Sequence, residues 1–280
     1  MKLPFDINFE GKVVAITGAA GVICSELSKA FACAKAKVAI LDLDLEKASK
    51  VAEEIKKDGG IAEAFQINCL KKEEIVACHK AVNDAFGKVD ILVNGAGGNN
   101  PKASTDDEFF DTTKEGLKTF FDLDPSGIEF VFNLNFLATL LVTQEFAKDM
   151  VNRKGCSILN ISSMNAFTPL TKIPAYSGAK ASVSNFTKWL AVYFSKIGIR
   201  VNAIAPGFFS TTQNKSLLWN KDGTPTARTH KILNNTPMDR FGEVSELVGA
   251  TLFLSSEEAA SFITGVVLPI DGGFSSYSGV

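Results

Sequence analysis

The sequence has 280 residues, of which 46% are hydrophobic and 21% are charged, a balance that excludes an intrinsically disordered chain. Lysine and arginine number 29 against 31 aspartate and glutamate residues, so no excess of positive charge is present for binding nucleic acid. The charged, proline-containing start MKLPFDINFEGK is unlike a signal peptide, and apolar runs such as 136–142 are shorter than a membrane span. We therefore expect a cytoplasmic protein that binds neither membrane nor nucleic acid.

Short apolar runs alternate with segments of helical spacing along the chain. Helices are expected at about 25–36, in a stretch that ends at Gly59 and Gly60, and at 72–86. The expected strands lie at 13–17, 37–42, 63–68, 89–94, 156–162, 199–205 and 266–270. Because these seven strands alternate with helices, we predict an α/β fold with one Rossmann-type, doubly wound parallel sheet flanked by helices.

Two long connections interrupt this alternation, at about 98–128 and 207–237. Connections of this length in a compact domain are usually functional, and both should lie at the carboxyl ends of strands, where ligands bind. No linker or repeat divides the chain. We therefore expect a single domain over 1–280, with an insert at 98–128 and a substrate lid at 207–237.

Cysteine and histidine residues give no sign of a metal site. The five cysteines lack CxxC spacing and are expected to be small buried residues in a reducing compartment. His79 and His230 have no cysteine or carboxylate at ligand spacing, and we expect both on the surface.

A glycine-containing turn follows the first expected strand. Gly18-Ala19-Ala20-Gly21 leads into a helix, whose unpaired N–H groups and dipole favour a pyrophosphate. Asp42 ends the second strand, near the spacing at which a carboxylate binds the adenosine ribose hydroxyls. A carboxylate there repels a 2′-phosphate, and Leu43 supplies no cation to accept one, so the sequence favours NAD over NADP. A solvated loop acid or a helix cap is the alternative for Asp42.

Tyr176 and Lys180 lie four residues apart, on a helix that opens near Pro174, so they share one helix face. An ammonium group near a phenol stabilises the phenolate. Ser163 ends the strand at 156–162, where its hydroxyl can donate to an oxygen that gains charge during hydride transfer. These three residues are candidate catalytic groups.

Together these motifs resemble those of the classical short-chain dehydrogenase/reductases, over roughly 12–273. TGAAGVIC (17–24) stands where the family has TGxxxGxG, and NGAG (94–97) where it has NNAG; PG (206–207) and DGG (271–273) follow. The resemblance implies that Tyr176 is the acid/base and that Ser163 polarises the carbonyl. It also implies that Lys180 grips the nicotinamide ribose and lowers the pKa of Tyr176, and that Asn135 holds a proton-relaying water.

The resemblance further implies an NAD site and a homotetramer, in which helices near 130–152 and 175–196 pair between subunits. The implied NAD-binding residues are Gly18, Ala20, Gly21, Val22, Ile23, Asp42, Leu43, Asn68, Cys69, Asn94, Gly95, Ala96, Tyr176, Lys180, Pro206, Gly207, Phe209 and Thr211.

Three positions depart from the family pattern. Val22 and Cys24 occupy the second and third glycine positions, and Gly21 is expected to adopt the positive φ that valine disfavours. Asn68 replaces an aspartate, although its amide oxygen can still accept a hydrogen bond from adenine.

Several segments, among them NGAGGNNPKAST, NISSMNAF and DGGFSSYSGV, resemble the D-mannonate oxidoreductase (fructuronate reductase) branch of this family. This narrower resemblance implies the reaction D-fructuronate + NADH ⇌ D-mannonate + NAD⁺. The alternatives are a gluconate 5-dehydrogenase, another polyol or 3-oxoacyl reductase, or a non-catalytic nucleotide-binding regulatory protein.

A sugar acid requires a cation for its carboxylate and polar groups for its hydroxyls. The substrate candidates are Asn99, Asn100, Lys102, Ser163, Asn165, Lys172, Gln213 and Asn214, of which Lys102 and Lys172 could bind the carboxylate. The pairs Phe109-Phe110 and Phe120-Phe121 are interpreted as core anchors for the insert. Trp219 could close over the substrate or pack within the lid.

Overall fold

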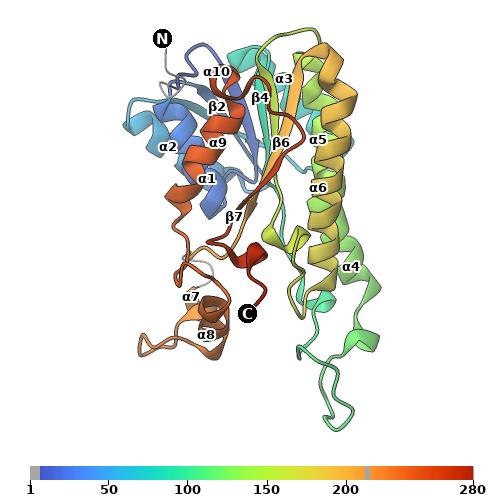
Figure 1. Ribbon diagram of the computed structural model, residues 1–280. Helices are drawn as coiled ribbons and strands as arrows, with labels where there is room; N and C mark the ends of the chain where they lie inside the picture. Colours follow the sequence, from blue (N-terminus) through green and yellow to red (C-terminus); the bar gives the residue numbers. More distant parts are fainter. Residues whose placement is uncertain (1–6, 212–214, 280) are drawn as a thin grey trace.

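The computed structural model describes residues 7–211 and 215–279, and it contains a central parallel sheet in the strand order β3-β2-β1-β4-β5-β6-β7 (Figure 1). The predicted seven-stranded doubly wound sheet is confirmed. The strands are β1 (Val13–Thr17), β2 (Lys37–Asp42), β3 (Ile61–Gln66), β4 (Ile91–Asn94), β5 (Cys156–Ile161), β6 (Ile199–Pro206) and β7 (Val267–Ile270).

Helices cover both faces of the sheet (Figure 1). One layer contains α1 (Val22–Cys33), α2 (Leu45–Lys57) and α9 (Val248–Ser255), and the other contains α3 (Lys72–Phe86), α5 (Ala138–Phe146) and α6 (Pro174–Phe194). The remaining helices are α4 (Pro125–Phe132), α7 (Lys215–Leu218), α8 (Ala227–Asn234) and α10 (Glu257–Ala260). Along β1, Val14 and Ile16 face the first layer while Val13 and Ala15 face the second, which explains the unbroken apolar run in the sequence.

The helix expected near 130–152 is not continuous. A π-helical turn, Asn133–Leu137, separates α4 from α5, and a 3₁₀ turn follows at Ala147–Met150. By length and composition the run Pro125–Met150 could cross a membrane. However, α5 packs against α3 and β4 and buries Val142 and Phe146 in the core, so packing accounts for its apolar character.

The expectation that His79 lies on the surface is wrong. The side chain is buried where α3 meets α5, with Nε2 2.8 Å from Asp149 Oδ2 and Nδ1 3.3 Å from Glu145 Oε1. Asp149 also accepts a hydrogen bond of 3.0 Å from the N–H of Val89. The two residues of each of these pairs lie sixty or more positions apart in sequence, so no local spacing indicates them. His230 is exposed, as expected.

The cysteines largely follow the expectation. Four of them, Cys24, Cys69, Cys78 and Cys156, are buried free thiols, whereas Cys33 at the end of α1 is exposed.

Asp149→Ala should lower the free energy of unfolding by about 2–4 kcal/mol, because it leaves His79 and the Val89 N–H buried without their acceptor. Urea denaturation measures this difference. The matched control is Asp84→Ala, which removes an exposed carboxylate paired with Lys80 and should cost less than about 1 kcal/mol. Equal effects of the two substitutions would show that the buried cluster contributes little.

Candidate active site

A pocket of about 840 Å³ opens at the carboxyl ends of the strands. Most of the predicted NAD-binding residues line it: Gly18, Ala20, Gly21, Val22, Ile23, Asp42, Leu43, Asn68, Cys69, Gly95, Ala96, Gly207, Phe209 and Thr211. The pocket is also lined by residues that the sequence motifs do not predict at this site: Cys24, Asp44, Lys47, Ile67, Leu70, Gly97, Phe130, Leu134 and Phe208. Phe130 and Leu134 lie four apart, a helical spacing that could have indicated a shared face.

Asn94, Tyr176, Lys180 and Pro206, also predicted to bind NAD, are not among the residues that line this pocket. The Asn94 Nδ2 donates to Thr143 Oγ1 and to Asn160 Oδ1, both at 2.9 Å, so this buried side chain ties β4 to α5 and β5. Pro206 is buried at the end of β6. Asn94 and Pro206 therefore stabilise the sheet beneath the pocket instead of lining it.

The turn between β1 and α1 requires glycine at its first position, where the 95–96 backbone passes close by. Gly18 has φ +64°, and a Cβ there would lie 3.0 Å from the Ala96 Cα. Gly21 has φ −73° and serves as the N-cap of α1 without a side-chain cap. The expected positive φ therefore falls at Gly18 rather than Gly21, and Val22 begins the helix without strain. The first turn of α1 presents N–H groups that lack partners within the helix, which suits a pyrophosphate.

Asp42 is held at the rim of this turn. Its Oδ2 accepts from the Ala20 N–H and its Oδ1 from the Asp44 N–H, both at 3.0 Å. The sequence analysis found no cation nearby, but Lys47 lines the same pocket. Its Nζ lies 2.8 Å from Asp44 Oδ2, so the neighbouring carboxylate neutralises this cation. Asn68 Oδ1 accepts from the Leu70 N–H at 3.0 Å, so this oxygen shapes a turn.

Lys180 lies one helical turn after Tyr176 on α6, as predicted, with its Nζ 5.7 Å from the centroid of the Tyr176 ring. The ammonium is buried and donates to the Ile161 carbonyl at 2.8 Å. Because burial disfavours the charged form, the pKa of Lys180 falls to about 8. Lys180 is therefore a cation held inside the protein at the end of β5.

Ser163 lies two residues after the end of β5. Burial raises the pKa of Tyr176, and the neighbouring Ser163 hydroxyl opposes this change only in part. The Lys180 ammonium donates to the Ile161 carbonyl, and the lowering of the Tyr176 pKa by Lys180 stays a prediction. A phenol that keeps its proton near neutral pH suits a proton donor.

Asn135 lies in the π-helical turn and is completely buried. Its Nδ2 donates to the Gly98 carbonyl at 2.7 Å and to the Val131 carbonyl at 2.8 Å, which satisfies backbone groups beside the widened turn. A Cβ on Gly97 would lie 2.6 Å from Asn135 Oδ1 and 3.2 Å from Lys180 Nζ. Asn135 and Lys180 therefore both lie against Gly97, and all four predicted catalytic residues border one region.

Among the substrate candidates, Asn165 best fits a ligand-facing role. It is buried beside Ser163, its N–H donates to Ser163 Oγ at 3.2 Å, and its Oδ1 has no hydrogen-bond partner within residues 7–211 and 215–279. Asn99 is exposed and donates to Ser104 Oγ, and Asn100 caps the short turn that follows it. Gln213 and Asn214 lie outside the described residues.

The two candidate lysines hold the insert in place. Lys172 has φ +70° and donates through Nζ to the Asp106 carbonyl at 2.6 Å, while Lys102 Nζ lies 3.2 Å from Asp124 Oδ2. An ion pair of 2.7 Å between Glu108 and Lys231 also joins the insert to α8. The insert and the 207–237 segment are therefore connected at one point.

The four phenylalanines of the insert are not core anchors. Phe109, Phe110, Phe120 and Phe121 are 63–80% exposed, in the insert that extends beyond α4 at the bottom of Figure 1. Three of the rings contact one another instead, with the Phe121 centroid 5.6 Å from that of Phe110 and 5.7 Å from that of Phe120. Trp219 contacts Phe241 and forms a bridge with Pro225, which favours packing within its own segment.

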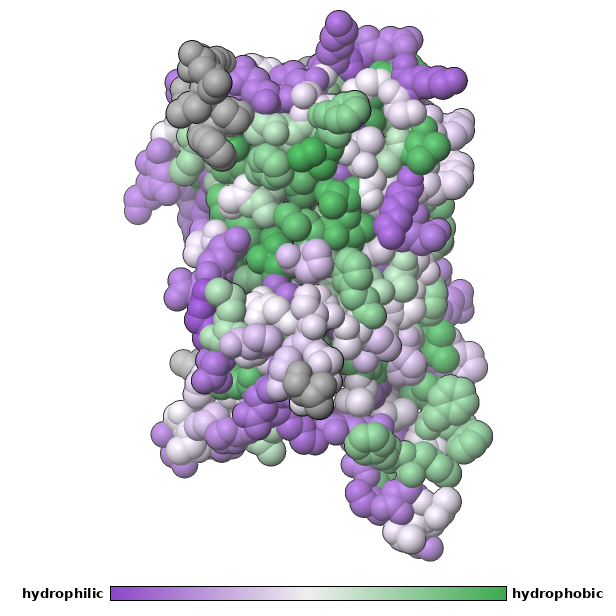
Figure 2. Space-filling model, viewed as in Figure 1, coloured by the Kyte–Doolittle hydropathy of each residue, from purple (hydrophilic) through white to green (hydrophobic). Residues whose placement is uncertain are grey.

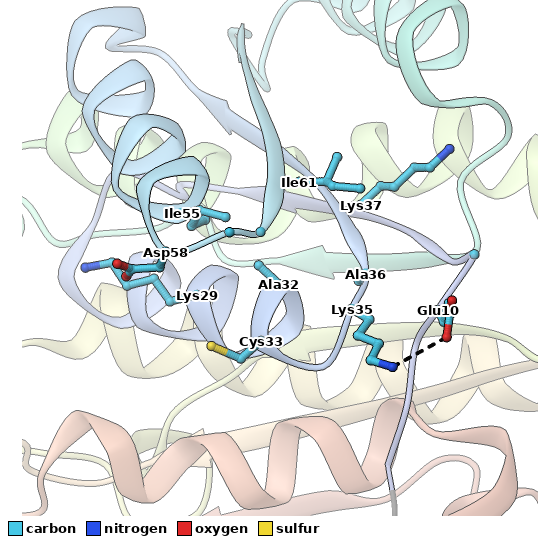
Figure 3. A pocket seen from close by; sticks show the side chains of 13 residues that line it. Glu10, Lys29, Ala32, Cys33, Lys35, Ala36, Lys37, Ile55, Asp58 and Ile61 are labelled. Carbon is cyan, nitrogen blue, oxygen red and sulfur yellow. Dashed lines mark ion pairs between the residues drawn. The ribbon is translucent and has the colours of Figure 1, made fainter.

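A second hollow of about 610 Å³ lies at the opposite edge of the sheet, beyond the ends of α1 and α2 (Figure 3). Ion pairs already involve some of its charged rim residues, with Lys35 Nζ 3.6 Å from Glu10 and Lys29 Nζ 2.7 Å from Glu54. None of the candidate site residues line it. Among the described residues, no group of three or more His, Cys, Asp or Glu could hold a metal ion.

The chain matches the short chain dehydrogenase family over residues 12–222. It is 61% identical to an uncharacterized oxidoreductase of Haemophilus influenzae, over 100% of this chain and 99% of that protein. A solved H. influenzae structure, provisionally described as a D-mannonate oxidoreductase with bound NAD, aligns at 60% identity and a TM-score of 0.96, with both chains fully covered. Two Escherichia coli enzymes, a 7alpha-hydroxysteroid dehydrogenase and a 5-keto-D-gluconate 5-reductase, are each 32% identical over 95–96% of this chain and 96% of their own.

Lys180→Met should stabilise the protein at pH 7 by on the order of 1–3 kcal/mol, because folding then no longer buries an ammonium. In the wild type, stability should rise between pH 8 and 10, where the unfolded chain still binds the proton that the folded protein has released. The variant should lack this rise. Urea denaturation at each pH gives the free energy of unfolding of both proteins, and the difference between the two values isolates the contribution of Lys180.

The control is Lys188→Met, which replaces an exposed lysine on the same helix. It should change neither the stability at pH 7 nor the rise in stability between pH 8 and 10. A Lys180→Met protein that is less stable at pH 7, with the wild-type dependence on pH, would contradict the burial cost assigned to Lys180.

Proposed function

The chain belongs to the short-chain dehydrogenase family, and from this premise we propose that it is an NAD-dependent oxidoreductase acting on a keto sugar acid. The reaction we favour is D-fructuronate + NADH ⇌ D-mannonate + NAD⁺. The observation that carries the proposal is the group formed by buried Ser163, partly buried Tyr176 and buried Lys180, which borders the nucleotide pocket where Lys180 lies against Gly97.

The residues of the pocket fit NAD. Gly18 and Gly21 form the turn at the start of α1 whose N–H groups can bind the pyrophosphate, and the Asp42 carboxylate beside this turn can accept from the ribose hydroxyls. The NAD bound in the H. influenzae relative supports the same assignment. When bound, NAD supplies the site with a hydride donor or acceptor.

In the direction of reduction, the Tyr176 phenol gives its proton to the oxygen that becomes the hydroxyl. Ser163 donates a hydrogen bond to the same oxygen as charge develops on it. In the direction of oxidation, Tyr176 must lose its proton first, and the Lys180 ammonium stabilises the resulting phenolate. Asn135 orients a water that passes protons to Lys180.

Two features support a sugar acid as substrate. Asn165 Oδ1 is a buried acceptor without a partner among the described residues, and it lies beside Ser163, where a substrate hydroxyl can donate to it. Lys102 and Lys172 supply positive charge to the adjoining insert, and a substrate carboxylate would compete with Asp124 for Lys102. The D-mannonate description of the H. influenzae structure agrees with this substrate class.

The second candidate is a 5-keto-gluconate reductase. The similarity to the E. coli 5-keto-D-gluconate 5-reductase favours it, because that substrate is also a six-carbon keto acid with several hydroxyls. The same groups, Asn165 and the two lysines, would bind it.

We also propose a homotetramer, supported by two exposed apolar faces. On α6, the rings of Trp189 and Tyr193 are stacked 4.9 Å apart and more than half exposed, next to exposed Val192. A second apolar area covers α9 and β7 (Figure 2), where β7 is an edge strand. Two different self-complementary faces on one chain produce a tetramer with two-fold symmetry.

With NADH, the purified protein should reduce D-fructuronate with a higher kcat/KM than 5-keto-D-gluconate or an acetoacetyl thioester, as measured by loss of absorbance at 340 nm. Tyr176→Phe should lower kcat by about a thousandfold, because the proton donor is lost while NADH still binds. Asn165→Ala should raise KM for the sugar acid more than it lowers kcat.

Tyr277→Phe provides the matched control, since this exposed tyrosine lies outside the pocket. A higher kcat/KM for 5-keto-D-gluconate would support the second candidate instead. NADH binding without turnover of any of the three compounds would support the regulatory alternative.

Asp42→Asn should weaken NADH binding by about tenfold or more and improve NADPH binding, because the carboxylate accepts from the ribose and repels a 2′-phosphate. Fluorescence titration with both nucleotides measures the ratio. Glu46→Gln, an exposed change in the first turn of α2, should leave the ratio unchanged. An unaltered ratio in Asp42→Asn would remove Asp42 from nucleotide selection.

A further inference from the structure

Cys24 occupies the space that a side chain at position 95 would need. A Cβ built on Gly95 would lie 2.2 Å from the Cys24 Sγ and 2.8 Å from the Thr17 carbonyl oxygen. The thiol is buried at the start of α1. The N–H groups of Gly95 and Ala96 donate to Thr17 Oγ1 at 3.1 and 3.2 Å, so the 95–97 segment is fixed against this corner of the fold.

The other end of the 95–97 segment borders the catalytic group. A Cβ on Gly97 would meet Asn135 Oδ1 at 2.6 Å and Lys180 Nζ at 3.2 Å. Gly95, Ala96 and Gly97 also line the nucleotide pocket. A displacement of this segment therefore changes the pocket and the surroundings of the Lys180 ammonium together.

Compared with the family pattern, positions 24 and 95 have exchanged which of them carries a side chain and which is glycine. Where that pattern has glycine in the helix-opening motif, this chain has Cys24, and where it has asparagine in NNAG, this chain has Gly95. The contact between them explains both departures at once, because the side chain gained on α1 fills the volume lost on the segment after β4.

We propose that Cys24 and Gly95 form a positioning pair, in which the thiol sets the depth of the 95–97 segment and thereby the shape of the NAD pocket beside Lys180. The contact is steric. Burial raises the pKa of Cys24 to about 12, so the group remains a neutral thiol and places no negative charge near Lys180.

A double-mutant cycle tests the pair through the Kd for NADH, measured by fluorescence titration, and through the unfolding temperature of the protein without nucleotide. Gly95→Ala should weaken NADH binding by about twentyfold, because its methyl group collides with the Cys24 Sγ. Cys24→Ala should weaken binding by only about two- to fivefold, because it removes one atom.

Combining Cys24→Ala with Gly95→Ala should recover at least about fivefold of the affinity lost by Gly95→Ala alone. Recovery stays partial because the Thr17 oxygen remains close to the new methyl group. The control combination is Cys78→Ala with Gly95→Ala. Cys78 is also a buried free thiol, but it neither lines this pocket nor is among the atoms nearest to Gly95, so this combination should give no recovery.

Losses that multiply without recovery in the first double variant would overturn the proposal, as would normal NADH binding by Gly95→Ala. Should Gly95→Ala fail to fold, Cys24→Val and Cys24→Ser decide the question. The larger valine should weaken NADH binding at least about fivefold, while serine, close to cysteine in size, should stay within about twofold. Equal affinities of these two variants would contradict the pair.

The pH profile of kcat distinguishes a positioning role of the Cys24–Gly95 pair from a role in stability alone. If Gly95→Ala displaces the segment beside Lys180, the midpoint of the profile should shift, and Cys24→Ala should restore it in the double variant. A lowered unfolding temperature with an unchanged profile and an unchanged Kd would indicate a structural role only. Wild-type NADH binding is measured first, so a failure of the proposed NAD dependence is distinguishable from a failure of the pair.

Discussion

The buried ammonium of Lys180 is the constraint on which the site depends. It requires a backbone carbonyl at the end of β5, which Ile161 provides, and a helix that brings Tyr176 one turn away. Burying a cation costs stability, and here the charge lies one helical turn from a phenol. The glycines of the 95–97 segment complete the arrangement, since any side chain at position 97 would occupy the space beside the amine.

The sheet was largely predictable because its strands are parallel and covered on both faces. Such strands give unbroken apolar runs, and the predicted and observed boundaries differ by two residues or fewer. The break in the long helix could not be predicted in the same way. The π-helical turn at Asn133–Leu137 contains Asn135, whose Nδ2 donates to the carbonyl of Gly98, a residue 37 positions away.

The nucleotide end and the substrate end of the site differ in how well they can be predicted from the sequence. Residues of the nucleotide end lie within or next to strand termini, so motif spacing alone places Gly18, Asp42 and Gly95 around one pocket. The substrate end is built from distant loops. There the sequence identifies Lys102 and Lys172 as charged residues but not their partners, Asp124 and the Asp106 carbonyl, which only the folded insert brings within reach.

The widened turn between α4 and α5 also gives the two halves of one long helix separate packing roles. Because a π turn shifts the helical register by a residue, the faces on either side are set independently. Before the turn, α4 packs against α6 and the start of the insert, whereas beyond it α5 packs against α3 and β4. Substitutions in α4 that change ligand specificity during evolution therefore leave the packing of α5 in the core unchanged, so new specificities can arise without loss of the fold.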